Sequence, residues 1–133
     1  MLGTDKFPGG ASFLYLSDRI LITGGVDAVK NAFYYVINSR SCEYLPSMIG
    51  GHEGHVSVIK DSMVFIISGK DEHDEYTNSC ERFDMIGENW MQIEEITLAR
   101  TYASGNCVGE NIYVTGGDTT EGTTDSIERY NIP

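Results

Sequence analysis

The sequence has 133 residues, of which 41% are hydrophobic and 22% charged, with nine Lys and Arg against twenty Asp and Glu. This length fits one modest domain, and a net charge of −11 argues against nucleic-acid binding because it would repel phosphate groups. No segment approaches the roughly 18 apolar residues of a membrane span, and the first 25 residues lack the pattern of a secretion signal. Three cysteines without a CxxC pair favour a reducing compartment, so we expect a cytoplasmic protein. We also expect that it binds no cofactor.

Three segments of the sequence align without gaps, and each predicts a β-hairpin. In each, an apolar strand and a polar turn precede a second strand that is apolar almost throughout, which indicates a strand covered on both faces. Fifteen glycines against three prolines fit many short strands joined by tight turns. The aligned segments are residues 11–25, 55–69 and 103–117.

Further strands follow each hairpin in chain order. Third strands are predicted at residues 32–37, 79–84 and 126–131, and fourth strands at 41–45 and 89–93. Four antiparallel strands at a period of about 46 residues predict an all-β chain of propeller blades. The blades are expected at about 11–47, 55–93 and 103–133, and the third lacks its fourth strand.

The repeated unit resembles the kelch-repeat β-propeller family. The shared features are a small pair closing the second strand, an aromatic residue after a Glu, a Trp, and a Leu-Pro-x-Met exit: Gly24-Gly25, Gly116-Gly117, Phe83, Tyr130, Trp90 and Leu45-Pro46-Ser47-Met48. Two positions depart from the pattern, since Ser68 replaces the first glycine of its pair and Cys42 stands where the family has Trp. The resemblance implies that these positions pack between blades, so we expect a looser outer edge in the first blade.

Three blades cannot close a ring, because propellers generally close with about 4 to 8. The chain is then a piece of a longer protein, or a homodimer that completes a six-blade ring, or an open array that adds a partner's strand to its exposed edge. Residues 1–10 are a poor source of the missing strand, because they lack a Trp-like anchor and contain Pro8.

The loops after the second and fourth strands emerge at one end of an antiparallel blade, and together they carry eleven acids and three bases. Kelch-like proteins bind partners with this loop set, so the resemblance and the charge both predict an adaptor or scaffold that binds a protein, for instance a basic peptide. Simple solvation of the loops is the alternative interpretation. The expected partner-binding residues are Asp71, Glu72, His73, Asp74, Glu75, Arg100, Asp118, Glu121 and His52.

Arg100 has a second interpretation. The resemblance places it facing the binding end, where it would engage an acidic group of a ligand. A local salt bridge with Glu94 or Glu95 is the alternative, because surface pairs of this kind are common.

No motif indicates catalysis or a metal site. The spacing of His52 and His55 could place two imidazoles on one metal, but zinc needs four ligands and no cysteine lies near them in the sequence, so we expect His55 to begin a strand instead. His73 lies among four acids that lack the spacing of a dedicated calcium loop. No phosphate loop, nucleophile elbow or dinucleotide fingerprint occurs. A fragment of a kelch-type copper oxidase or sugar epimerase, and a structural cytoskeletal module, are the alternatives to a binding module. Cys42, Cys80 and Cys107 fall on or beside predicted strands, and we interpret them as small core residues.

Overall fold

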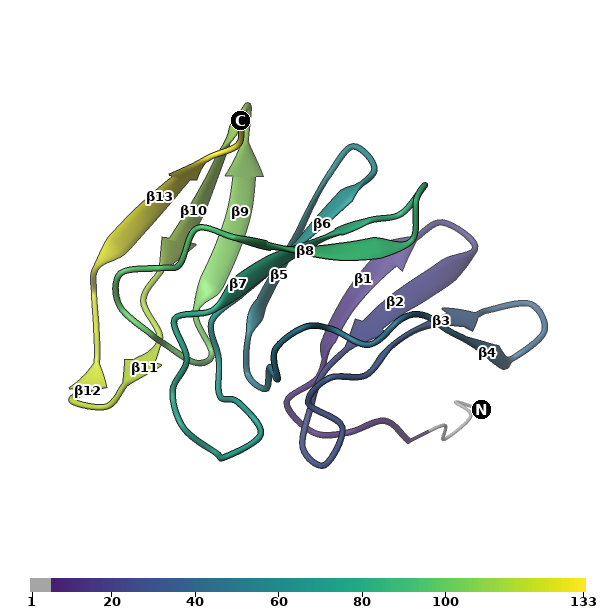
Figure 1. Cartoon of the computed structure of the whole chain (residues 1–133), viewed down its shortest axis with the longest axis horizontal. Helices are drawn as coiled ribbons and strands as arrows, with labels where there is room; N and C mark the ends of the chain where they lie inside the picture. The colour runs from purple at the N-terminus through teal and green to yellow at the C-terminus, as the bar shows by residue number, and fades with distance from the viewer. Residues whose placement is uncertain (1–5) are drawn as a thin grey trace.

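The computed structural model describes residues 6–133, which form thirteen β-strands and no helix (Figure 1). Two four-stranded antiparallel sheets, the first and second blades, have the strand orders β1-β2-β3-β4 and β5-β6-β7-β8. Their strands are β1 (Ser12–Leu16), β2 (Arg19–Thr23), β3 (Ala32–Val36), β4 (Ser41–Tyr44), β5 (Val56–Lys60), β6 (Met63–Ile67), β7 (Cys80–Asp84) and β8 (Asn89–Ile93). The predicted all-β fold of four-stranded blades is therefore confirmed.

The third blade has three strands, in the order β13-β10-β9. They are β9 (Ser104–Val108), β10 (Asn111–Thr115) and β13 (Ile127–Asn131). One edge of β13 has no neighbouring strand in the described chain. A small hairpin of β11 (Asp118–Thr119) and β12 (Gly122–Thr123) was not predicted, because two-residue strands leave no periodic signal.

The three blades are arranged like a fan that does not close into a ring (Figure 1). The first strands lie together on the inner side, since β5 contacts both β1 and β9. Two apolar clusters fill the junctions between successive blades. Leu21, Tyr34, Val64, Ile66 and Phe83 are central to the junction of blades one and two. Phe65, Ile67, Ile112 and Val114 are central to the junction of blades two and three.

The predicted irregularities of the repeat have clear structural counterparts. Trp90 on β8 donates its indole N–H to the carbonyl of Pro46, 2.7 Å away in the preceding connection, and its ring lies 4.7 Å from that of Phe83. Cys42 takes the corresponding place on β4 and is exposed. The outer edge of the first blade therefore lacks this tie.

The interpretation of the three cysteines as core residues is correct for one of them. Cys80 is buried, Cys107 is partly buried, and Cys42 is exposed because it points away from the junction on an outermost strand. Burial raises the pKa of the Cys80 thiol to about 11, so this cysteine is an unreactive core residue.

No helix in residues 6–133 is long and apolar enough to cross a membrane.

Residues 6–10 lie against the first blade. The ring of Phe7 contacts those of Phe13, Phe33 and Tyr35 at centroid distances of 5.6–6.3 Å, and the carbonyl of Gly9 accepts the N–H of Val26. This segment therefore does not supply a fourth strand to the third blade. Residues 1–5, the rest of the segment considered for that role, lie outside the described residues.

Candidate functional site

The loops that follow the second strand of each blade lie along one side of the molecule, the lower side in Figure 1. The loop of the second blade, residues 68–79, carries four of the predicted partner-binding acids and His73. The loop of the third blade contains β11 and β12, and the loop of the first blade spans residues 24–31. This side is the predicted binding end.

The acidic segment of the second blade is held by its own hydrogen bonds. One carboxylate oxygen of Asp71 accepts the backbone N–H groups of His73 and Glu75 at 2.8 and 3.1 Å. The backbone of Asp71 exchanges further hydrogen bonds with Asp74 and Glu75. Asp71 therefore has a structural function as an acceptor in addition to its charge, because Asp favours turns by binding backbone N–H groups ahead of it.

Five carboxylates surround one groove between the first and second blades, which we call the acidic groove. Its volume is about 510 Å³, and it is lined by Asp27 from the first blade, by Glu53 from the connection, and by Asp71, Glu72 and Asp74 from the second blade. The two loops approach closely at Gly51, where a Cβ atom would come within 2.9 Å of the backbone nitrogen of Glu72. Because Gly51 has no side chain, the two loops can lie close together and bring these carboxylates to one groove.

Two lysines compensate part of this charge. Lys30 lies 3.6 Å from Glu72, and Lys70 lies 3.2 Å from Asp74. A hydrogen bond from its own backbone N–H, assisted by Lys30, holds the pKa of Glu72 below its usual value. Within residues 6–133 no cation forms a salt bridge with Asp27, Glu53 or Asp71. The groove therefore keeps a negative potential.

The other predicted acids lie outside the acidic groove. Glu75 and His73 are exposed on the loop that borders it. Asp118 exchanges both backbone hydrogen bonds with Thr101, at 2.9 and 2.8 Å, and Glu121 is exposed in the turn between β11 and β12. These residues occupy the same side of the molecule without forming one cluster.

Arg100 is buried, so its side chain does not reach the surface at the predicted binding end. Its guanidinium donates to the carbonyl oxygens of Leu98, Gly116 and Ser126, and it lies 2.8 Å from a carboxylate oxygen of Glu128. The alternative of a surface pair with Glu94 or Glu95 is also wrong, because the side chain turns inward to the edge of β13. Arg100 thus joins the second and third blades from within.

His52 is the structural counterpart of Arg100 one blade earlier. Its Nδ1 donates to the carbonyl of Ser68 at 2.7 Å, and its Nε2 lies 3.0 Å from a carboxylate oxygen of Glu81. The His52 side chain is wholly buried, so it is not available to a partner. Sequence reasoning missed these two pairs, although the Glu-Arg-aromatic core repeated on β7 and β13 was the available signal.

Each of these glutamates also anchors the connection between blades. Glu81 accepts the backbone N–H groups of Ile49 and Gly50, and Glu128 accepts those of Thr97 and Leu98. Burial by itself would raise the pKa of Glu128, but these hydrogen bonds and Arg100 lower it. The same polar link is therefore built twice, once at each junction.

The histidines do not form a metal centre with other ligands. His55 precedes β5, and its Nε2 lies 2.9 Å from the hydroxyl of Thr23. Its Nδ1 is buried and has no hydrogen-bond partner among residues 6–133. Across the same residues, no three His, Cys, Asp or Glu side chains are grouped to hold a metal ion.

Comparison with protein-family models matches residues 99–132 to the kelch motif. The chain carries a kelch repeat. The match spans the third blade, including Arg100, the pair Gly116 and Gly117, and Glu128. The hydrogen bonds of His52 repeat those of Arg100 at the preceding junction. The predicted resemblance to the kelch family is confirmed by the match over residues 99–132. No curated protein matches the chain.

Proposed function

We propose that this chain is a non-catalytic interaction module, an adaptor or scaffold, that binds a basic peptide segment in the acidic groove. The carrying observation is that five carboxylates from two kelch blades and their connection surround one groove, and that three of them form no salt bridge within residues 6–133. Negative potential of this kind accelerates the approach of a cationic partner and selects against acidic ones.

The groove suits Arg or Lys side chains better than a single bound anion or metal. Asp27 and Asp71 come from neighbouring loops, so a peptide crossing the groove meets carboxylates on both sides. Arg matches a carboxylate with two parallel hydrogen bonds, whereas Lys acts as a point charge. We therefore expect Arg-containing peptides to bind more tightly than Lys-containing peptides of equal charge.

The experiment uses isosteric charge removal, so that the Asp71 turn is preserved. Asp27→Asn, Glu53→Gln and Asp71→Asn are combined, because an Asn oxygen still accepts the N–H groups of His73 and Glu75. The control combines Glu43→Gln, Glu88→Gln and Glu110→Gln, which remove the same charge from exposed positions outside the groove. Binding of a fluorescein-labelled peptide of alternating Arg and Gly is measured by anisotropy at 0.05 and 0.15 M salt.

The groove variant is expected to weaken binding at least about tenfold and the control less than threefold. Equal losses in both variants would mean that the chain attracts the peptide only through its net charge, and the groove proposal would then be abandoned. A control loss larger than the groove loss would place the site elsewhere.

We also propose a cytoplasmic location and a homodimer that completes a ring. Three free cysteines, one of them exposed, support a reducing compartment. Cell fractionation tests the location, and secretion of the chain would contradict it.

In the proposed dimer, the outer face of the third blade would cover the outer face of the partner's first blade. Phe13, Phe33 and Tyr44 lie in one row across that sheet.

A further inference from the structure

The acidic groove has an apolar lining as well as its carboxylates. Val26 and Val29, both from the loop between β2 and β3, line it together with the five acids. The side chain of Val26 is 46% exposed. Contact with an apolar group of a ligand would remove this aliphatic surface from water, which is favourable. The groove therefore offers a contact that a peptide of Arg and Gly alone does not use.

The apolar and acidic residues come from different walls of the groove. Both valines belong to the loop of the first blade, where Asp27 is the single carboxylate of the lining, whereas three carboxylates belong to the loop of the second blade. The two walls converge at Gly51. A Cβ atom at this position would come within 2.9 Å of a methyl carbon of Val29 and within 2.8 Å of a carboxylate oxygen of Glu72. One wall is thus mainly apolar and the other acidic.

Backbone hydrogen bonds hold these walls in place. The N–H of His52 donates to the carbonyl oxygen of Val29 at 2.8 Å, and the N–H of Lys70 donates to the carbonyl oxygen of Glu53 at 2.9 Å. The connection between the blades is therefore tied to the loop of the first blade and to the loop of the second. Because the groove is formed before a ligand arrives, ordering its walls costs little on binding.

An extended peptide matches two unlike walls, because its side chains point alternately to opposite sides. Arg at every second position would face the carboxylates of the second blade. Aliphatic residues at the positions between them would face Val26 and Val29. A peptide with the same residues in two separate blocks could not satisfy both walls along its length.

We propose that the acidic groove binds an extended protein segment in which Arg alternates with aliphatic residues. This pattern rests on the proposed binding of a basic peptide and adds to it a requirement for apolar residues. The arginines supply charge complementarity and rapid approach, and the aliphatic residues supply burial of apolar surface, which does not depend on charge.

Three labelled peptides of equal length and equal charge test the pattern. The first alternates Arg and Val, the second has the same residues as one Arg block and one Val block, and the third alternates Arg and Gly. Each is titrated into the whole chain, and binding is followed by fluorescence anisotropy. The alternating Arg–Val peptide is expected to bind at least about fivefold more tightly than either of the others, because partial burial of Val side chains contributes on this scale.

Salt provides a second readout of the apolar contribution. The affinity of the alternating Arg–Val peptide divided by that of the Arg–Gly peptide should be the same at 0.05 and 0.15 M salt, because peptides of equal charge are screened equally. A ratio that collapses at the higher salt would show that the valines of the peptide do not contribute through burial.

Two isosteric variants test the apolar wall. Val26→Thr keeps the shape of the side chain and replaces a methyl group with a hydroxyl, so the preference for the Arg–Val peptide is expected to fall below about twofold, while binding of the Arg–Gly peptide stays unchanged. Val29→Thr makes the same change deeper in the wall. The control is Ile86→Thr, because Ile86 is 83% exposed in the turn between β7 and β8, outside the groove.

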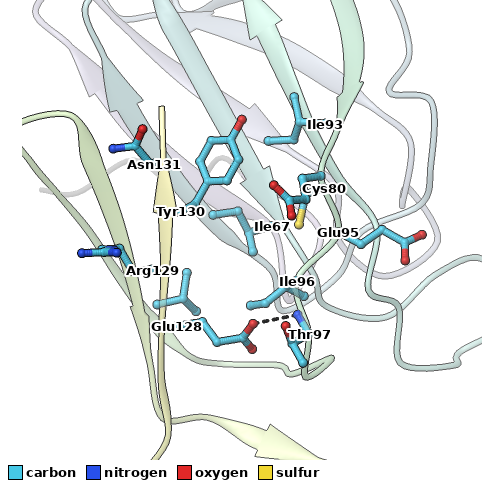
Figure 2. Close-up of a pocket in the computed structure, with 12 residues that line it drawn as sticks. Ile67, Cys80, Ile93, Glu95, Ile96, Thr97, Glu128, Arg129, Tyr130 and Asn131 are labelled. Carbon is cyan, nitrogen blue, oxygen red and sulfur yellow. Dashed lines mark hydrogen bonds between the residues drawn. The ribbon is translucent and has the colours of Figure 1, made fainter. Parts of the chain in front are cut away.

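A second groove, beside β13, is the competing place for such a peptide. Its volume is about 320 Å³, and Figure 2 shows Ile93 and Tyr130 in its lining together with Glu95. Glu94→Gln combined with Glu95→Gln removes charge from this groove. The double variant is expected to change binding of the alternating peptide less than about threefold, because exposed charges outside the site act only through a screened field.

The outcomes separate the pattern from the proposed function. Equal binding of the alternating and block peptides, or an unchanged preference in folded Val26→Thr and Val29→Thr, would overturn the pattern alone, provided that loss of the groove charges still weakens binding of the Arg–Gly peptide. If loss of those charges affects neither peptide, the proposed function fails and the pattern fails with it. A larger loss in the Glu94 and Glu95 variant than in Val26→Thr would place the peptide beside β13 and overturn the pattern.

Discussion

His55 is a buried base whose neutral form the fold requires. Burial, with a smaller contribution from the charge of His52, lowers the pKa of His55 to about 3, from an ordinary value of 6.5. At pH values between about 3 and 6.5, His55 is protonated in the unfolded chain and neutral in the folded chain. The free energy of unfolding therefore falls as the pH drops below 6.5. One group of this kind costs about 2 to 3 kcal/mol between pH 6.5 and 4.5.

We therefore predict that His55→Gln flattens the pH dependence of the free energy of unfolding over this interval, as measured by urea titration at several pH values. His73→Gln is the matched control, because His73 is exposed, and it should leave the slope unchanged. An identical slope in the parent chain and His55→Gln would show that His55 is not the responsible base.

A substitution at Gly24 tests how closely successive blades approach each other. It has a φ of +64°, and a Cβ atom would clash with the carbonyl oxygen of His52 in the connection to the next blade. Gly109 has a similar φ of +61° and open space around it. Gly109→Ala should cost about 1 to 2 kcal/mol from backbone strain alone, and Gly24→Ala should cost about 1 to 3 kcal/mol more because the blades must separate. Equal losses in thermal unfolding would contradict close contact at this junction.

At the scale of the element, the connection between blades two and three depends on one buried cation. The Arg100 side chain has no exposed surface, and Arg100→Met would remove the guanidinium that pairs with Glu128 and donates to the carbonyl oxygens of Leu98, Gly116 and Ser126. Removing one partner of a buried pair costs about 3 to 5 kcal/mol, and the partial exposure of Glu128 places the expectation near the lower value. Arg129→Met, on the neighbouring exposed position, should change stability by less than about 0.5 kcal/mol.

Hydrogen exchange gives the element-specific readout for this substitution. The amides of Thr97 and Leu98, which donate to Glu128, should lose protection in Arg100→Met, while those of Ile49 and Gly50 at the other junction should keep it. Uniform loss of protection at both junctions would indicate that the two polar links do not act separately.

At the scale of the whole molecule, the two end faces of the array differ in character. The outer face of the first blade exposes Phe13 by 52% and Tyr44 by 75%, whereas the third blade carries Asn106 and Arg129 in its outward rows. Exposed aromatic patches of this kind mark interaction surfaces. We predict by light scattering that the chain forms a dimer and that Phe13→Ser with Tyr44→Ser returns it to 14.7 kDa.

Closure of a ring also requires that the outer face of the third blade takes part in the dimer interface. Val108→Ser with Ile127→Ser on the outer face of the third blade should also dissociate the dimer, because a two-fold ring places unlike faces together. A monomeric parent chain, or a dimer indifferent to the second pair, would contradict ring closure.

The sequence alone determined the long strands of the three blades and their order, because both are local properties. Residues 89–93 were predicted from apolar patterning between turn signals, and β8 has the same bounds. The free edge of β13 followed from counting strands in each repeat. Such features depend on neighbours within one hairpin, whose pairing is set by short turns and alternation.

Only the tertiary structure decided which of the expected partner-binding residues are buried. Arg100 and His52 were expected at the surface, but their acceptors, Glu128 and Glu81, lie 28 and 29 residues away in the chain and draw them inside. The acidic groove likewise forms between segments of different blades. Long-range packing determines where these groups lie. The sequence pattern around a charged residue is the same whether its side chain is solvated or paired within a junction, because the pairing residue is distant in the chain and approaches only on folding.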